Sequence, residues 1–198
     1  TEDGMLLKRR AQEIVQLVDK AENEFRHGEE ELSGNISIGS GETNSVQELA
    51  DVMERFTETY PMVRYDLYTA NADDIKDRLD KGLLDIGLLT EPVDISKYNF
   101  IRLRRKERWG VLVRKDYELA RKKSITPEDL LDVPVFLVQR PLVKNELEGW
   151  FGDYYDQIHV IGTYNLINNV AVMVERKVGV ALCFHLQNRF DELKYIPL

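Results

Sequence analysis

The feature that most constrains the fold of this chain is a regular alternation of short apolar segments with amphipathic helical segments, beginning at Asn35. Residues 35–89 contain the β-type runs NISIG, MVRYDLYT and LDIGLL, separated by the helical segments SVQELADVMERFTETY and ADDIKDRLDKG. Strands that alternate with helices pair in parallel and are joined by right-handed crossovers. This part of the chain is therefore predicted to be an α/β body built on a parallel sheet.

A second, less regular alternation follows. Residues 99–116 (NFIRLRRKERWGVLVRKD) suggest two β runs, and Pro127 is expected to open a helix in SITPEDLLD. Further strands are predicted at VPVFLV, QIHVIG, VGVALCF and LKYIPL, with helices at ELEGWFGDYY and NLINNVAVMVERK. The chain is thus predicted to fold into two α/β lobes.

The N-terminal segment has the periodicity of a helix that packs along one seam. Its apolar residues are spaced by four and three positions in turn: Leu7, Ala11, Ile14, Val18, Ala21 and Phe25. Thr1 can cap this helix, and His27-Gly28 is expected to end it. The helix can lie on its own globular body or form a seam with a second chain. The polar tether HGEEELSG that follows favours the dimerising seam.

Composition excludes several classes of protein. The formal net charge is −8 at pH 7, so this segment is expected to repel phosphate backbones and to bind nucleic acid poorly by itself. No apolar run approaches the roughly 20 residues that a membrane helix needs, and no secretion signal is recognisable at the start. The single cysteine, Cys183, cannot form an internal disulfide and indicates a reducing compartment.

Five strings, in this order, resemble the LysR-type transcriptional regulators: TEDGMLLKRRAQEIVQLVDKAE, GNISIG, ELADVMERFTETYPMV, LDKGLLDIGLL and MVERKVGVALCF. The resemblance covers nearly the whole chain. It implies a cytoplasmic regulator that forms a homodimer or homotetramer and binds operator DNA through an N-terminal winged helix-turn-helix, which is absent from this sequence. What is present would be a long dimerisation helix and an effector-binding domain with the two-lobed type-2 periplasmic-binding-protein fold.

The same resemblance implies three regions. Residues 1–28 would be the linker helix, residues 34–113 plus 185–198 the first effector-binding lobe, and residues 114–184 the second lobe. In open parallel sheets ligands bind beyond the carboxyl ends of the strands. The candidate effector-binding residues are Ser40, Gly41, Thr43, Asn44, Asn71, Leu89, Thr90, Gln139, Arg140, Tyr164 and Asn165.

The segment GSGETNS, residues 39–45, is the richest of these candidates. A small, hydroxyl-rich turn before a helix offers free N–H groups that suit an anion such as a carboxylate. The alternative is that Thr43, Asn44 or Ser45 only caps the helix. Glu42 would oppose an anionic effector unless its side chain turns outward. Asp85, at the opposite end of its strand, is expected to be structural, holding the preceding helix turn.

The other candidates also have a second interpretation. Asn71 serves equally well as a helix cap, and most arginines that follow a strand are simply solvated, although an arginine fork at Arg140 would suit a carboxylate. The segment GTYNLINN opens the last long helix, and four of its residues are expected to line the other wall of the site: Thr163, Tyr164, Asn165 and Asn168.

No catalytic residue, metal ligand set or cofactor motif is predicted. The three histidines show no metal-binding spacing, and Cys183 is best explained as a small buried apolar residue. Three alternatives stay open: a solute-binding protein of a transporter, which needs a secretion signal and no heptad helix; an enzyme, which needs an acid or base in the cleft; and a structural dimer module, which binds no ligand.

Overall fold

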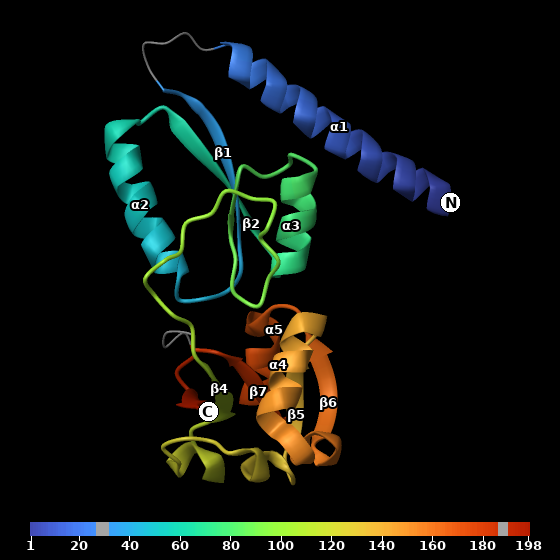
Figure 1. Cartoon of the computed structure of the whole chain (residues 1–198), viewed down its shortest axis with the longest axis vertical. Coiled ribbons are helices and arrows are strands. Elements are labelled where there is room, and N and C mark those ends of the chain that lie inside the picture. Colours follow the sequence, from blue (N-terminus) through green and yellow to red (C-terminus); the bar gives the residue numbers. More distant parts are fainter. Residues whose placement is uncertain (27–31, 186–189) are drawn as a thin grey trace. The chain divides into compact units, whose positions relative to one another are not determined.

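The computed structural model describes residues 1–26, 32–185 and 190–198. These residues form two compact units, unit 1 (Thr1–Ser40 and Gln47–Leu89) and unit 2 (Gly41–Val46 and Thr90–Leu198). Unit 1 contains α1 (Glu2–Arg26), β1 (Gly34–Ser40), α2 (Val46–Thr59), β2 (Val63–Thr69), α3 (Ala72–Asp80) and β3 (Ile86–Leu88), as Figure 1 shows. The expected end of the first helix at His27-Gly28 lies outside the described residues.

The sheet of unit 1 is parallel throughout, with strand order β2-β1-β3, as the sequence predicts. The chain moves from β1 to β2 and then back past β1 to β3, so right-handed crossovers place α2 and α3 on opposite faces (Figure 1). On the α3 face, Ile75 is fully buried. Gly39 of β1 allows this packing, because a Cβ there would lie 2.7 Å from Leu84 Cδ1 and 2.8 Å from Ile75 Cγ2.

Asp85 joins the start of β3 to β1, and its expected role at the preceding helix turn stays a prediction. Its carboxylate accepts a hydrogen bond from the Ser37 N–H at 2.8 Å, and its own N–H donates to the Ser37 carbonyl at 2.8 Å. These two bonds attach the start of β3 to β1, while the preceding helix turn is closed by backbone bonds around Gly82, whose φ is +70°.

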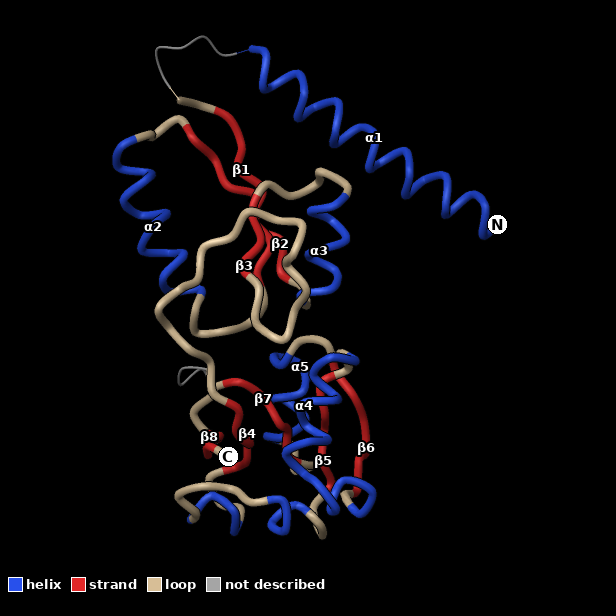
Figure 2. The backbone as a smooth tube through the Cα atoms, in the orientation of Figure 1, coloured by secondary structure: helices blue, strands red, loops and turns tan. Residues whose placement is uncertain are grey.

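Unit 2 is built on a five-stranded mixed sheet with order β6-β5-β7-β4-β8 (Figure 2). Its strands are β4 (Trp109–Arg114), β5 (Pro134–Val138), β6 (His159–Tyr164), β7 (Val180–Phe184) and β8 (Leu193–Pro197). Its helices are α4 (Pro141–Phe151) and α5 (Ile167–Glu175), with short 3-10 turns η1 (Glu118–Arg121), η2 (Pro127–Leu130) and η3 (Gly152–Gln157). The helix expected to open at Pro127 is therefore only a 3-10 turn.

Each face of this sheet carries its own apolar core. Strand residues alternate between the faces, so Val111 and Val113 pack on the side of α4, while Leu112 packs on the side of α5. All three are buried, which explains why β4 is apolar on both faces. Two β runs were predicted within residues 99–116, and the prediction of a run before β4 is wrong. Residues 99–108 form no strand, and their basic side chains are all exposed: Arg102, Arg104, Arg105, Lys106 and Arg108.

The compact units differ in extent from the lobes expected from the sequence. Residues 90–113 and the C-terminal strand group with unit 2, because β4 pairs antiparallel with both β7 and β8. The loop of residues 41–46 groups with unit 2 as well. The lobes 34–113 plus 185–198 and 114–184, as functional bodies, stay a prediction.

Candidate functional site

The expected candidates of unit 1 gather at one edge of its sheet. The register places Ser40 opposite Thr69 of β2 and opposite Leu88 of β3, so the three strands end at the same level. Leu89 follows β3 directly and packs partly against the small core of Ala70, Ile75 and Leu84. The carboxyl edge predicted from the alternation is therefore present.

Asn71, at the same edge, is a helix cap. Its side-chain oxygen accepts hydrogen bonds from the N–H groups of Asp73 at 2.9 Å and Asp74 at 3.0 Å. Its amide nitrogen donates to the Asp74 carboxylate at 2.8 Å. Of the two interpretations of Asn71, the structure shows the cap; a contact with an effector stays a prediction.

Four candidates of unit 2 lie at one edge of its sheet in the same way: Gln139, Arg140, Tyr164 and Asn165. Parallel pairing of β5 with β6 places Val138 opposite Tyr164, and the Gln139 N–H donates to the Tyr164 carbonyl at 2.8 Å. Arg140 and Asn165 therefore follow two neighbouring strands at the same end. This is the arrangement that the sequence predicts for side chains around a ligand site of an α/β sheet.

Arg140 is not the solvated arginine that usually follows a strand. Only 7% of its surface is exposed, and its Nη2 donates to the carbonyl of Pro92 at 2.9 Å. A buried guanidinium needs hydrogen-bond acceptors, because desolvation of an unpaired charge is costly. The Arg140 guanidinium therefore binds, at least in part, to the loop that contains Pro92 in the same unit.

Tyr164 is buried at the start of the segment that leads into α5. Its hydroxyl donates to the carbonyl of Leu182 in β7, and burial raises the pKa of this phenol well above its usual range, with smaller contributions from Cys183 and the Glu42 carboxylate. Asn165 accepts a hydrogen bond from the Leu166 N–H at 2.9 Å. In the structure, Tyr164 therefore packs in the core and bonds to the sheet.

The loop of residues 41–46 is attached to unit 2 by side chains. Glu42 accepts from the Asn168 N–H at 3.1 Å and also from the Asn168 side-chain amide. Its carboxylate is therefore bonded at the start of α5.

Two further contacts hold the same loop. Asn44 Nδ2 lies 3.3 Å from His185 Nδ1, at hydrogen-bond distance. The N–H and the hydroxyl of Ser45 both donate to Glu107 Oε1, at 2.8 and 2.6 Å. Glu107 and His185 were not predicted. The sequence contains one weak signal for Glu107, since it is the only acid in the basic run of residues 102–108.

Thr43 stands apart from its neighbours. Its side chain is buried, with 8% of the residue exposed, and its Oγ1 has no hydrogen-bond partner among the described residues. Native proteins seldom leave a buried hydroxyl unpaired, because it loses its bonds to water without replacement. Thr43 is therefore the expected site residue with an unused polar group.

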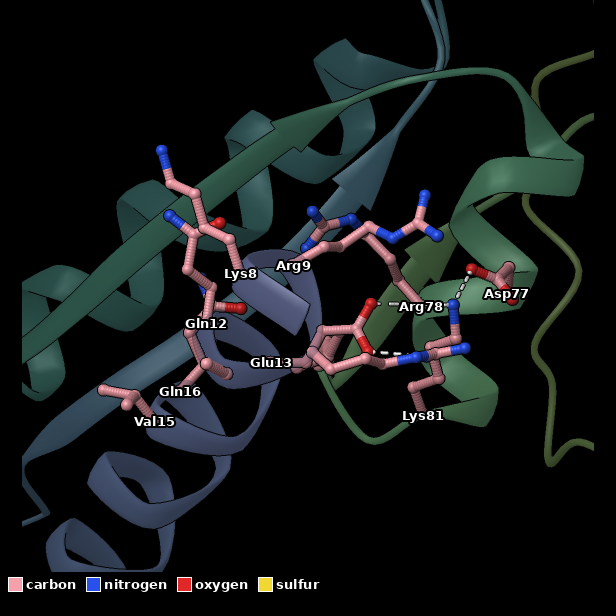
Figure 3. A pocket seen from close by; sticks show the side chains of 12 residues that line it. Lys8, Arg9, Gln12, Glu13, Val15, Gln16, Asp77, Arg78 and Lys81 are labelled. Carbon is pink, nitrogen blue, oxygen red and sulfur yellow. Dashed lines mark hydrogen bonds and ion pairs between the residues drawn. The ribbon is translucent and has the colours of Figure 1, made fainter. Parts of the chain in front are cut away.

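Unit 1 also contains an open pocket of about 760 Å³ between α1 and α3 (Figure 3). None of the expected effector residues lines it. Glu13 accepts a bond from Arg10 at 2.8 Å and lies 3.9 Å from Lys81, which pairs with Asp77 at 2.6 Å. The charges at its centre are thus largely paired with one another, as expected where a helix rests on its neighbour.

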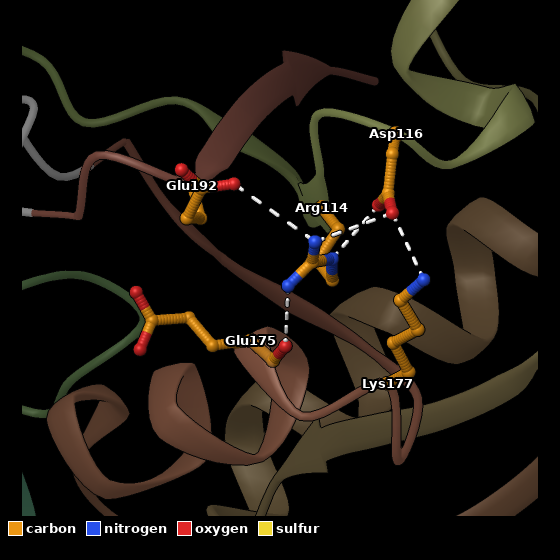
Figure 4. Close-up of polar contacts among 5 residues, drawn as sticks. All are labelled: Arg114, Asp116, Glu175, Lys177 and Glu192. Atoms are coloured by element: carbon orange, nitrogen blue, oxygen red, sulfur yellow. Dashed lines mark hydrogen bonds and ion pairs between the residues drawn. The ribbon is translucent and has the colours of Figure 1, made fainter.

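A second charged cluster joins β4, the end of α5 and the segment before β8 (Figure 4). Arg114 binds both carboxylate oxygens of Asp116, at 2.8 and 3.2 Å, and donates to the Glu175 carbonyl at 2.9 Å. Lys177 lies 2.9 Å from the same carboxylate. These hydrogen bonds from Arg114 and Lys177 hold the pKa of Asp116 far below its usual range. The cluster connects elements and leaves Asp116 fully paired.

Within residues 1–26, 32–185 and 190–198, no group of three or more His, Cys, Asp or Glu is arranged to hold a metal ion. Burial raises the pKa of the Cys183 thiol to about 12, which makes it a poor nucleophile. Across the same described ranges, no helix is long and apolar enough to cross a membrane.

The fold is shared with solved structures. The two units, the first of which includes the long helix α1, each contain an α/β sheet and match the periplasmic-binding-protein-like fold of solved effector-binding domains. The effector-binding domain of QuiR in complex with shikimate aligns with a TM-score of 0.72 at 15% identity, over 84% of this chain and 81% of that one. HinK, a LysR family transcriptional regulator from Pseudomonas aeruginosa, aligns with a TM-score of 0.66 at 20% identity, over 100% of this chain and 71% of that one.

The sequence comparison defines the family. The LysR substrate binding domain matches residues 29–198, and the chain belongs to this family. A curated relative, the uncharacterized HTH-type transcriptional regulator YvbU of Bacillus subtilis (strain 168), is 25% identical over 187 residues, which is 92% of this chain and 61% of that protein. YraN, described in the same terms and from the same strain, is 24% identical over 81% of this chain and 53% of its own length. The chain thus spans about half to three-fifths of these relatives.

Proposed function

We propose that this chain is the effector-sensing and oligomerisation part of a cytoplasmic LysR-type transcription regulator. A small molecule binds at the carboxyl ends of the strands, between the two lobes, and changes how the whole protein acts on operator DNA through a winged helix-turn-helix. The ligand shifts this equilibrium only as far as it prefers one arrangement of the protein over another. The chain binds its ligand and does not convert it.

The observation that carries this proposal is the loop after β1. It is anchored on both sides of Thr43, by Glu42 and by Ser45, and yet the buried Thr43 hydroxyl has no partner among the described residues. Small-molecule sites orient their ligands with a few polar groups, and in open α/β sheets such sites lie beyond the strand ends. In each unit, the carboxyl ends of neighbouring parallel strands lie at one edge of the sheet: β1 to β3 in unit 1, and β5 with β6 in unit 2.

Calorimetry with a panel of metabolites tests the site. We expect a ligand of the wild-type chain to lose at least about tenfold in affinity when Ser40→Ala, Thr43→Ala and Asn44→Ala are combined, since each removed bond contributes roughly 0.5–1.5 kcal/mol. A matched triple substitution at exposed polar positions of α2, Thr57→Ala, Glu58→Ala and Thr59→Ala, should leave affinity unchanged. Equal affinity of the site variant and the wild type would refute the site.

The oligomerisation part of the proposal rests on α1. Its predicted seam residues Leu7, Ile14 and Val18 are 70%, 61% and 50% exposed, so the seam does not pack on the described part of its own chain. Ala11 and Ala21 are exposed as well; Phe25 lies in the helix, with its side chain outside the described part. Exposed apolar residues at heptad spacing favour a helix–helix contact with a second copy. The solute-binding alternative offers no role for such a helix.

Sedimentation measurements test this contact. Leu7→Asp with Ile14→Asp should raise the dimer dissociation constant by at least about 100-fold, since two apolar side chains each contribute roughly 1.5–3 kcal/mol when buried. Gln16→Asp changes the charge of the same helix away from the seam and should have little effect. An unchanged dimer in the double variant would show that α1 does not hold the copies together.

A further inference from the structure

Helix α5 begins without a cap of its own. Its N-cap position is Leu166, whose side chain makes no capping hydrogen bond, and its first turn contains no acidic residue. The first N–H groups of a helix have no partner inside the helix and carry a partial positive charge. Such a helix start attracts an anion.

The anion comes from a distant part of the sequence. Glu42, 126 residues away from Asn168, places one carboxylate oxygen 3.1 Å from the Asn168 N–H in the first turn of α5 and the other at the Asn168 side-chain amide. A carboxylate that accepts two hydrogen bonds at a helix start occupies the place that an effector carboxylate would take. The chain thus supplies this anion itself.

The neighbouring Thr43 has an unpaired hydroxyl in the part of the chain that the structure describes. Its hydroxyl is buried beside Glu42 and is unpaired among the described residues, whereas the hydroxyl of Ser45 is already bonded to Glu107. This loop therefore carries one carboxylate, Glu42, and binds a second, Glu107, through Ser45. The charge around the free hydroxyl is unfavourable for a second anion.

We propose that Glu42 determines the charge class of the ligand. It fills the anion position at α5, so this end of the site takes a hydroxyl, amide or ammonium group and excludes a carboxylate. The proposal rests on the proposed function for the existence of an effector, while the role of Glu42 at α5 can be tested without one.

Chemical rescue with acetate tests that role. Glu42→Ala should lower Tm by about 2–6 °C, the range expected when a helix cap is lost from a chain of this length. Acetate at about 200 mM should recover about half of that loss by binding the exposed helix start. Acetamide has the same shape without the charge and should recover nothing. Sodium chloride at equal ionic strength is the reference in each case.

Two variants serve as controls. Glu54→Ala removes an exposed carboxylate of α2 and should respond to acetate no more than the wild type does. Glu42→Gln keeps an acceptor and fills the space, so it should be destabilised without being rescued. Acetate that raises the Tm of all variants equally would overturn the proposal. If Glu42→Ala does not fold, the Tm difference between wild type and Glu42→Gln should shrink as salt rises, and a salt-independent difference would overturn it instead.

Ligand class is then tested with pairs of carboxylates and their primary amides, added to the wild type and to Glu42→Ala. The wild type should favour the amide of each pair, and the variant should gain at least about tenfold for the carboxylate. A wild type that prefers carboxylates would overturn the inference. If acetate rescues Glu42→Ala but no compound of the panel binds, the role of Glu42 at the start of α5 is supported. That result would count only against the proposed effector site.

Discussion

Replacing Thr43 by valine is expected to stabilise the protein while weakening ligand binding. Valine has nearly the shape of threonine, so the packing around this 8%-exposed residue is kept. What is removed is a buried hydroxyl with no partner among the described residues. Stability and binding should therefore change in opposite directions, as they do where a polar group is held ready for a ligand.

The magnitude follows from the cost of an unpaired polar group. A buried donor or acceptor without a partner costs about 1–3 kcal/mol. Allowing for relaxation around the loop, Thr43→Val should raise the free energy of unfolding by about 1 kcal/mol. For a chain of this length that is a rise in Tm of about 2–4 °C.

Chemical denaturation and calorimetric melting, without ligand, measure this change. Thr43→Ser keeps the hydroxyl and should show no gain. Thr57→Val is the control at an exposed position, where the hydroxyl bonds to the Met53 carbonyl at 2.8 Å, and should change stability by less than about 0.5 kcal/mol. If Thr43→Val is less stable than the wild type, the hydroxyl has a partner in solution and the reasoning fails.

Three further predictions concern unit 2. Gly110→Ala should lower the free energy of unfolding in urea by more than about 2 kcal/mol, because the new Cβ would clash with the Ile196 carbonyl oxygen. Gly149→Ala, with open space around it in α4, should raise the free energy of unfolding by about 0.5–1 kcal/mol. The pKa of Asp116 is depressed in the folded state, so its carboxylate stabilises the protein above its ordinary pKa, and this stabilisation is lost as the pH falls below that value. In melting measurements between pH 7 and 2, Asp116→Asn should therefore lose less stability on acidification than the wild type does. With its pKa raised to about 12, Cys183 should resist alkylation at pH 8 in the native state and react fully in urea, and fast native labelling would contradict its burial.

The secondary structure was largely predictable because its signals are local. Apolar residues at alternate positions mark β1 and β2, and those at helical spacing mark α2 and α5, so each element shows its buried face within a few residues. The parallel sheet of unit 1 follows from that alternation through the crossover rule. Residues 99–108 are the exception, because their apolar residues alternate with exposed arginines although the segment pairs with no strand.

The candidate site was predictable only in part. Parallel pairing guarantees that Ser40 and Thr69, or Val138 and Tyr164, end at the same edge of a sheet, so placing side chains at these edges needed no coordinates. What each side chain does there was open. In the structure, Asn71 caps α3 and Arg140 bonds to the Pro92 carbonyl, each within its own unit. The spacing of residues in the sequence does not tell these contacts apart from solvation or from contact with a ligand.

The sequence alone determined three features: the α/β alternation, the heptad spacing of apolar residues in α1, and the strand ends at which polar residues gather. All three follow from the periodicity of apolar residues over short segments. Only the tertiary structure decided that Glu42 bonds to Asn168 and Ser45 to Glu107, and that Thr43 between them is buried without a partner. Such pairings join residues tens to more than a hundred positions apart. Nothing local in the sequence encodes which charge will meet which helix end, since that depends on how the packed sheets bring the loops together.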